Sequence, residues 1–352
     1  MNGVFEADSA GWFTSDDGVK LFLRRWSPGG GPKAVLHIVH GMAEHSLRYG
    51  RLARRLNGAG VEVWAADQRG HGRTADQAVN DPGRGGLPGH CADRGGFDRV
   101  TLDVNLINRK IREERPGLPL FLLGHSWGSF IAQHYIETFA GKDAEGGAAP
   151  VDGCALSGTR GPGGFRIRAG SFFMAVLAFA AGKRRASALA RAAADGPYNK
   201  PFRPNRTPFD WLSRDEQEVD AYVQDPACGG LCSAGFYRDM VNGLYRIHAR
   251  AAMERIDRDL PVYVFSGSAD PAGGMGSSPT GLVNAYRFMG MKDLEFVLYP
   301  GARHETLNET NREEVSENLL AWILKHSGET GRDPAGSGPG ETARPDAGFS
   351  AP

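Results

Sequence analysis

Two kinds of hydrophobic pattern alternate along most of the chain. Short apolar runs rich in β-branched residues have the length of buried strands, and between them apolar residues recur three and four apart, as on one face of a helix. Strand-like runs cover residues 34–39, 61–65, 118–123, 151–157, 261–266 and 294–299. Helical spacing covers residues 49–57, 97–114, 282–289 and 313–326, and another helix is expected from residue 129 onward. This alternation predicts an α/β fold, with a mainly parallel sheet covered by helices on both faces.

The ends and the middle of the chain depart from this alternation. Two short runs around an Asp-Asp-Gly turn, at 11–15 and 20–26, predict a hairpin that adds antiparallel edge strands. From residue 161 to about 250 the alternation stops, which predicts a helical cap or lid inserted between two core strands. Beyond Ser327 the residues are mostly Gly, Pro, Ala, Asp and Glu, a composition typical of disorder. The predicted organisation is a core formed by residues 1–160 and 251–327, a cap at 161–250 and a tail at 328–352.

Composition narrows the class of protein and its partners. A chain of 352 residues with 41% hydrophobic and 23% charged residues can bury a large core. Its formal net charge of zero argues against nucleic acid or an anionic membrane as the main partner. Four cysteines without Cys-x-x-Cys spacing predict neither a zinc site nor a disulfide framework and fit a reducing compartment.

Targeting signals are weak. The first twelve residues lack the basic start and apolar middle of a signal peptide. The longest apolar stretch, residues 172–181, has about half the length needed to cross a bilayer. We therefore expect a cytoplasmic protein that can also lie peripherally at a membrane.

The strongest chemical signal is Gly-His-Ser-Trp-Gly at positions 124–128. The pattern G-x-S-x-G is common by chance in a chain with 49 glycines, but here a predicted strand precedes it and a predicted helix follows it. That context is typical of a nucleophile elbow, in which a strained turn exposes the serine hydroxyl above the sheet. Ser126 is therefore the predicted nucleophile.

A serine nucleophile needs a base and an acid that orients the base. Sites in open parallel sheets form at the carboxyl ends of the strands, so residues that directly follow a strand are the candidates. Asp270 follows the strand at 261–266, and His304 follows the strand at 294–299. The chain order Ser, Asp, His is the one this sheet architecture uses. We expect His304 to accept the proton of Ser126 and Asp270 to hold the imidazole tautomer.

The oxyanion donors should come from two loops. We assign them to the backbone N–H groups of Met42, in the His-Gly-Met loop after the strand at 34–39, and of Trp127. Both side chains are expected to wall the acyl site. Glu44 and His45 are a poor metal-ligand set because no further Cys or His spacing accompanies them, so structural roles are expected for both.

Five motifs occur in one characteristic order. They are His40-Gly41-Met42-Ala43-Glu44-His45, Asp67-Gln68-Arg69-Gly70-His71-Gly72, Gly124-His125-Ser126-Trp127-Gly128, Gly267-Ser268-Ala269-Asp270-Pro271 and Arg303-His304-Glu305. Together they resemble the monoacylglycerol lipase and lysophospholipase group of α/β-hydrolases, which is often filed under a serine aminopeptidase-like domain. The resemblance runs from about residue 11 to residue 326.

The resemblance implies a Ser-His-Asp esterase of the α/β-hydrolase fold that acts on lipid esters without metal or cofactor. It also implies a lid that can rest transiently on a membrane surface. Two positions depart from the family pattern: Trp127 stands where Met is frequent, and Ala272 stands where a β-branched residue is common. The bulk of Trp127 is expected to narrow the acyl pocket.

Two alternatives stay open at this point. A peptidase of the same architecture would need an acidic group in the cap for the substrate ammonium, and Glu216, Glu218 and Asp220 are available. A non-catalytic binding protein on a hydrolase scaffold is the other, although an intact Ser126, Asp270 and His304 set argues against it. The preferred hypothesis is a hydrolase of monoacylglycerol, lysophospholipid or a small ester.

Overall fold

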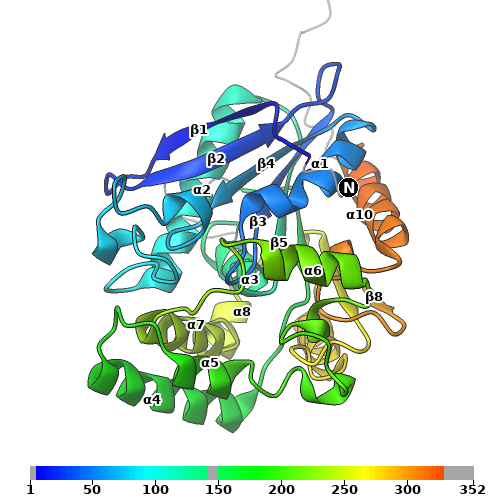
Figure 1. Ribbon diagram of the computed structural model, residues 1–352. Coiled ribbons are helices and arrows are strands. Elements are labelled where there is room, and N and C mark those ends of the chain that lie inside the picture. The colour runs from blue at the N-terminus through cyan, green and yellow to red at the C-terminus, as the bar shows by residue number, and fades with distance from the viewer. Residues whose placement is uncertain (1–4, 141–149, 329–352) are drawn as a thin grey trace, which may run out of the picture.

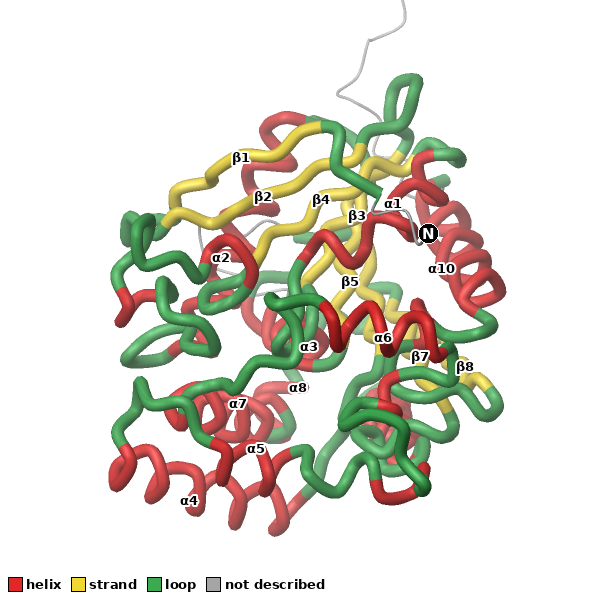
Figure 2. The backbone as a smooth tube through the Cα atoms, viewed as in Figure 1, coloured by secondary structure: helices red, strands yellow, loops and turns green. Residues whose placement is uncertain are grey.

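A single eight-stranded sheet runs through the computed structural model, which describes residues 5–140 and 150–328 (Figures 1 and 2). The strands are β1 Ser9–Thr14, β2 Lys20–Trp26, β3 Ala34–Val39, β4 Val61–Asp67, β5 Leu120–His125, β6 Gly153–Ser157, β7 Val262–Gly267 and β8 Leu294–Tyr299. Their order is β1-β2-β4-β3-β5-β6-β7-β8. The pairs β1/β2 and β2/β4 are antiparallel and all other pairs are parallel, which confirms the predicted mainly parallel sheet with a leading hairpin.

The central strands are buried along their whole length and mostly apolar, because both faces of the sheet are covered. In β3, Val35 and Val39 belong to the core on one face, whereas Leu36 and Ile38 belong to the core on the other. Helices α2 (Gly96–Glu114), α3 (Trp127–Thr138) and α9 (Ser277–Phe288) supply side chains to the first core. Helices α1 (Gly50–Asn57) and α10 (Arg312–Ser327) supply the second and lie side by side in Figure 1.

The chain between β6 and β7 forms helices rather than strands. They are α4 Gly164–Ala181, α5 Ala188–Ala194, α6 Glu216–Gln224, α7 Ala234–Ile247 and α8 Arg250–Met253. Figure 1 shows α4, α5 and α7 grouped together, away from β1 and β2. We keep the name cap for residues 161–250.

Short 3-10 helices complete the described chain. They are η1 Ser46–Tyr49, η2 Gly72–Thr74, η3 Pro82–Arg84, η4 Lys200–Phe202, η5 Asp210–Leu212 and η6 Thr306–Asn308. Among residues 5–140 and 150–328, no helix has the length and apolar character needed to traverse a bilayer. The tail expected at 328–352 lies, apart from Gly328, outside the described residues.

Candidate active site

Ser126 occupies a sharp turn between β5 and α3. Its backbone has φ 51° and ψ −120°, a conformation that costs a non-glycine residue about 1–3 kcal/mol and that only a tightly packed surrounding can hold. Close packing also explains the glycines on either side. A Cβ on Gly128 would lie 2.0 Å from the carbonyl oxygen of Val39, and one on Gly124 would lie 2.4 Å from the carbonyl oxygen of Gly128. The strand and helix therefore approach as closely as a nucleophile elbow requires.

The structure brings Ser126, His304 and Asp270 into one hydrogen-bonded row. His304 Nε2 lies 2.8 Å from Ser126 Oγ, and His304 Nδ1 lies 2.9 Å from Asp270 Oδ2. The other Asp270 oxygen, Oδ1, accepts a hydrogen bond of 2.8 Å from the backbone N–H of Ala272, which fixes the carboxylate. Asp270 follows β7 and His304 follows β8, as expected for groups at the carboxyl ends of parallel strands.

Burial and charge set the protonation of the triad histidine. Burial by itself would lower the pKa of His304, but the charge and hydrogen bond of Asp270 outweigh it and raise this pKa above its ordinary value. The neighbouring ring of His125 lies 5.0 Å from that of His304, and burial, together with His304, lowers the pKa of His125 to about 4. His125 therefore stays neutral near pH 7.

A buried ion network supports the loop that carries Met42. Glu44 accepts a hydrogen bond from the backbone N–H of Gly41 and one of 2.9 Å from the Tyr49 hydroxyl. Arg48 donates a hydrogen bond of 2.7 Å to Glu44 and one of 2.7 Å to each carboxylate oxygen of Glu305. Burial would raise the pKa of Glu44, but Arg48 and the nearby histidines outweigh it and lower this pKa to about 2.

The ion pair between Arg48 and Glu305 was not predicted from the sequence. Arg48 lies just before the helix expected at 49–57, and its partner Glu305 is 257 positions away, so no local spacing joins them. Glu305 directly follows His304, and this adjacency is the one signal that could have pointed to it.

A narrow cavity of about 40 Å³ lies in front of Ser126. It is lined by the loop of Met42 and by cap residues, among them Arg191, Asp195, Phe209 and Trp211. The same four residues also line a larger groove of about 580 Å³, so the cavity and the groove meet across these side chains.

Trp211 and Asp195 determine the chemical properties of the junction, which is the set of four side chains shared by the cavity and the groove. The Trp211 ring lies 5.0 Å from the His304 ring and shields it on the cap side. Burial raises the pKa of Asp195 to about 6, and its distance to Arg191 is a loose 3.8 Å. The junction therefore offers both an aromatic surface and a carboxylate with free acceptor capacity.

The expectation for the Trp127 side chain is not met. Its indole ring packs against Phe97 and Phe236 at 5.3 and 5.0 Å, and its Nε1 donates to Gln68 Oε1 at 2.9 Å. It is 1% exposed and does not line the cavity, because the first turn of α3 directs it into the core. Met42 does line the cavity, and the backbone N–H groups of both residues stay the assigned oxyanion donors.

The cap acids considered for an aminopeptidase also lie elsewhere. Glu218 pairs with Arg51, and Asp220 pairs with Arg206, which Glu216 approaches at 3.9 Å. None of the three acids lines the cavity at Ser126. They hold elements of the structure together instead of facing a substrate ammonium.

The sheet, the elbow and the Ser-His-Asp row define an α/β-hydrolase with the site of a serine hydrolase. Comparison with known families agrees: the model described as "Serine aminopeptidase, S33" matches residues 30–311, and the chain belongs to this family.

Two curated relatives and one solved structure resemble most of the chain. The monoacylglycerol lipase of Mycolicibacterium smegmatis is 28% identical over 89% of this chain and 96% of its own length. The monoglyceride lipase of Homo sapiens is 28% identical over 90% of both chains. The crystal structure of a thermostable carboxyl esterase from Bacillus coagulans superimposes with a TM-score of 0.80 at 26% identity, covering 91% of this chain and 99% of the esterase.

Proposed function

We propose that Ser126, His304 and Asp270 cleave monoacylglycerols through an acyl-enzyme. The chain is a carboxylic ester hydrolase of the monoacylglycerol lipase type, and its substrate is a small lipid ester. Within that class we assign catalysis to these three residues and glycerol as the head group of the substrate. The observation that carries it is the continuous row of 2.8 and 2.9 Å contacts from hydroxyl to imidazole to carboxylate, beside a cavity that shares lining residues with a larger groove.

The geometry supports the usual two-step reaction. His304 takes the proton from Ser126 as the hydroxyl oxygen attacks the ester carbonyl, and Asp270 stabilises the resulting imidazolium. The backbone N–H groups of Met42 and Trp127 receive the negative charge on the carbonyl oxygen. His304 then protonates the departing glycerol, and water repeats the sequence to release the fatty acid and restore Ser126.

The charges around the cavity favour a neutral glycerol head group over a phosphodiester. Arg48 is already paired with two carboxylates, and Arg191 donates to the carbonyl oxygen of Gly229 and lies over the Phe209 ring. Asp195 is left with free acceptor capacity, which suits a hydroxyl donor and repels a phosphate.

We also propose that α4 touches lipid surfaces transiently. Phe172 and Phe179, on this cap helix, are 74% and 93% exposed, and Phe173 and Val176 are exposed beside them. An exposed apolar strip of this kind on an otherwise polar surface marks an interaction site. The basic residues Lys183 and Arg184, by contrast, are engaged by Asp93.

We further propose a reducing, cytoplasmic location with reversible membrane contact. The support comes from the four cysteines, all of which are buried free thiols.

Activity-based labelling tests the nucleophile. A fluorophosphonate probe should label the wild type and fail to label Ser126→Ala, while Ser9→Ala, at an exposed serine on β1, should label normally. Labelling that persists in a folded Ser126→Ala protein would refute the assignment.

Paired substrates test the head group. Monoacylglycerol should be hydrolysed with a higher kcat/KM than lysophosphatidylcholine of the same acyl chain, and Asp195→Asn should narrow that ratio. Faster turnover of the lysophospholipid, or activity confined to aminoacyl-nitroanilides, would replace the proposed substrate class.

Vesicle sedimentation tests the membrane contact. The double variant Phe172→Ser/Phe179→Ser should bind phosphatidylcholine vesicles more weakly, because it removes two exposed aromatic anchors. Phe288→Ser is the matched control, since Phe288 is 86% exposed but lies at the end of α9, outside the cap. Equal losses in both variants would show that α4 has no special role.

A further inference from the structure

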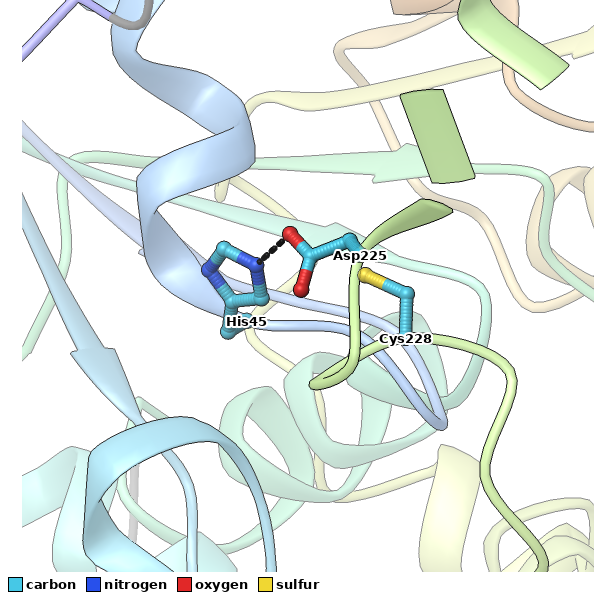
Figure 3. A group of neighbouring side chains, drawn as sticks. All are labelled: His45, Asp225 and Cys228. Carbon is cyan, nitrogen blue, oxygen red and sulfur yellow. Dashed lines mark hydrogen bonds and ion pairs between the residues drawn. The ribbon is translucent and has the colours of Figure 1, made fainter. Parts of the chain in front are cut away.

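Three side chains outside the triad converge between the catalytic core and the cap. His45 comes directly after the loop of Met42, whereas Asp225 and Cys228 follow α6 in the cap. One ligand atom from each lies within 4.8 Å of the other two. Figure 3 shows the imidazole facing the Asp225 carboxylate, with the Cys228 sulfur turned toward the same carboxylate.

The contacts around these three side chains leave their ligand atoms available to bind a metal ion. His45 Nε2 bonds to Asp225 Oδ2 at 2.8 Å, and Asp225 Oδ1 is fixed by the backbone N–H of Ala227 at 2.8 Å. Cys228 is a free thiol, and within the described residues its sulfur has no hydrogen-bond partner. Two of the three residues are buried, but the Asp225 side chain is 31% exposed, which leaves a path from solvent.

We propose that His45, Asp225 and Cys228 form a zinc site that clamps the cap to the loop of Met42. An imidazole nitrogen, a thiolate sulfur and a carboxylate oxygen are the donor types of protein zinc sites, with bonds of about 2.0–2.3 Å. Calcium and magnesium would require an all-oxygen set. Three protein ligands leave a fourth position for water.

The geometry needs only a small adjustment. Tetrahedral bonds of that length place ligand atoms about 3.5 Å apart. The 2.8 Å His45–Asp225 contact therefore opens by less than about 1 Å, and the separations from Cys228, which are at most 4.8 Å, close by no more than about 1.3 Å. The N–H of Ala227 stays on the second carboxylate oxygen and orients it, as outer hydrogen bonds do in metal sites. When the metal ion binds, the Cys228 thiol releases its proton to solvent and the thiolate sulfur becomes a ligand. No oxidation or reduction occurs.

Local charges are compatible with a divalent cation. The carboxylate and the thiolate together balance its charge of +2. Arg48, whose positive charge acts on Asp225 and Cys228, is already paired with Glu44 and Glu305. A second cluster, Asp293, Glu295 and His326, has no thiol, and Lys325 already lies 3.0 Å from Glu295.

A bound ion would reinforce contacts that already join the two parts. The carbonyl oxygen of Ala43, next to Met42, accepts hydrogen bonds of 2.9 Å from the Tyr222 hydroxyl and from the backbone N–H of Gly229. Gly229 adjoins Cys228, so an ion held by Cys228 and His45 would fasten this segment to the loop of Met42 at a second point. No local sequence pattern indicates this site, because Asp225 and Cys228 lie 180 and 183 positions after His45.

Cobalt(II) reports directly on such a site. Metal-free full-length protein titrated with Co²⁺ should develop a thiolate-to-cobalt absorption band that saturates at one equivalent and disappears when Zn²⁺ is added. Cys228→Ser should lose the band and bind Zn²⁺ at least about 100-fold more weakly, since losing a ligand costs no less than losing its outer partner. Cys232→Ser, which removes a buried thiol outside the cluster, should behave as the wild type.

Thermal unfolding provides an independent measurement. Zn²⁺ should raise the Tm of the wild type and of Cys232→Ser but not of Cys228→Ser or His45→Gln, because an ion stabilises only the state that binds it. All these measurements hold equally in Ser126→Ala, so they do not depend on catalysis. A cobalt spectrum without a thiolate band, or equal Zn²⁺ affinity in the wild type and Cys228→Ser, would refute the proposed zinc site.

Discussion

Replacing Asp270 with asparagine removes one charge from the triad and almost nothing else. The two side chains have the same shape, the position is fully buried, and the Ala272 N–H can still bond to the remaining oxygen. The amide, however, can present an N–H to His304 Nδ1 and so favours the wrong imidazole tautomer. In the serine protease precedent this change lowers kcat by about 10⁴, which corresponds to about 5.4 kcal/mol of transition-state stabilisation.

The same substitution should shift the pH profile in a defined direction. Burial lowers the pKa of His304, and Asp270 more than reverses that effect in the wild type. Without the carboxylate, burial prevails and the pKa of His304 falls. Because the base must be neutral, the acid limb of kcat/KM should move to lower pH in Asp270→Asn while the plateau drops.

The assay is kcat/KM on a soluble nitrophenyl ester between pH 4 and 9. Asp293→Asn is the matched control, since Asp293 lies 3.0 Å from His326 in another His–Asp pair, at the opposite end of β8 from His304. It should leave both the plateau and the acid limb unchanged. An acid limb that stays in place or rises in Asp270→Asn would refute the proposed role of the carboxylate, as would a loss of less than about tenfold.

Three further changes probe the base, the elbow and a buried acid. His304→Ala should lower kcat at least about 10⁴-fold with an unchanged circular dichroism spectrum, and a loss below about tenfold would mean that another group is the base. Gly128→Ala should reduce the free energy of unfolding in urea by about 3 kcal/mol, because its Cβ would meet the Val39 carbonyl oxygen at 2.0 Å; a neutral result would contradict the tight elbow. Burial raises the pKa of Glu137 to about 7, so its ionisation costs the folded state increasingly as pH rises from about 4.5 to 7, up to about 3 kcal/mol. Glu137→Gln should therefore stabilise the protein at pH 8 and not at pH 4, and an equal gain at both values would exclude this explanation.

The sheet and the reaction chemistry could be predicted because both follow from short-range patterns. Apolar runs predicted the strands to within a few residues, and the candidate catalytic residues follow directly after those runs. Ser126, Asp270 and His304 could be chosen without an alignment because a parallel sheet gathers its strand ends at one edge. The main error concerned Trp127, whose direction depends on the first turn of α3 and on the space beside Phe97 and Phe236.

The cap was harder to predict because its contacts are made between distant segments. Its helices could be expected only as a break in the strand–helix alternation, and their helical spacing did not show which faces would meet the core. The pairing of Glu218 with Arg51 spans 167 positions, and the His45–Asp225 contact spans 180. Spacing in the sequence carries no information about such pairs, so the acids of α6 looked available for a substrate when they are not.

The core and the cap therefore determine different properties: the core determines the reaction type, and the cap determines which substrate is accepted. The proposed catalytic groups directly follow strands of the sheet, whereas Arg191, Asp195, Phe209 and Trp211 come from the cap and line both the cavity and the groove. A change in cap sequence can therefore alter which ester is accepted without moving the triad. We therefore expect that any group that restrains the cap, including an ion shared by His45 and Cys228, changes the rate of substrate entry more than the rate of the chemical step.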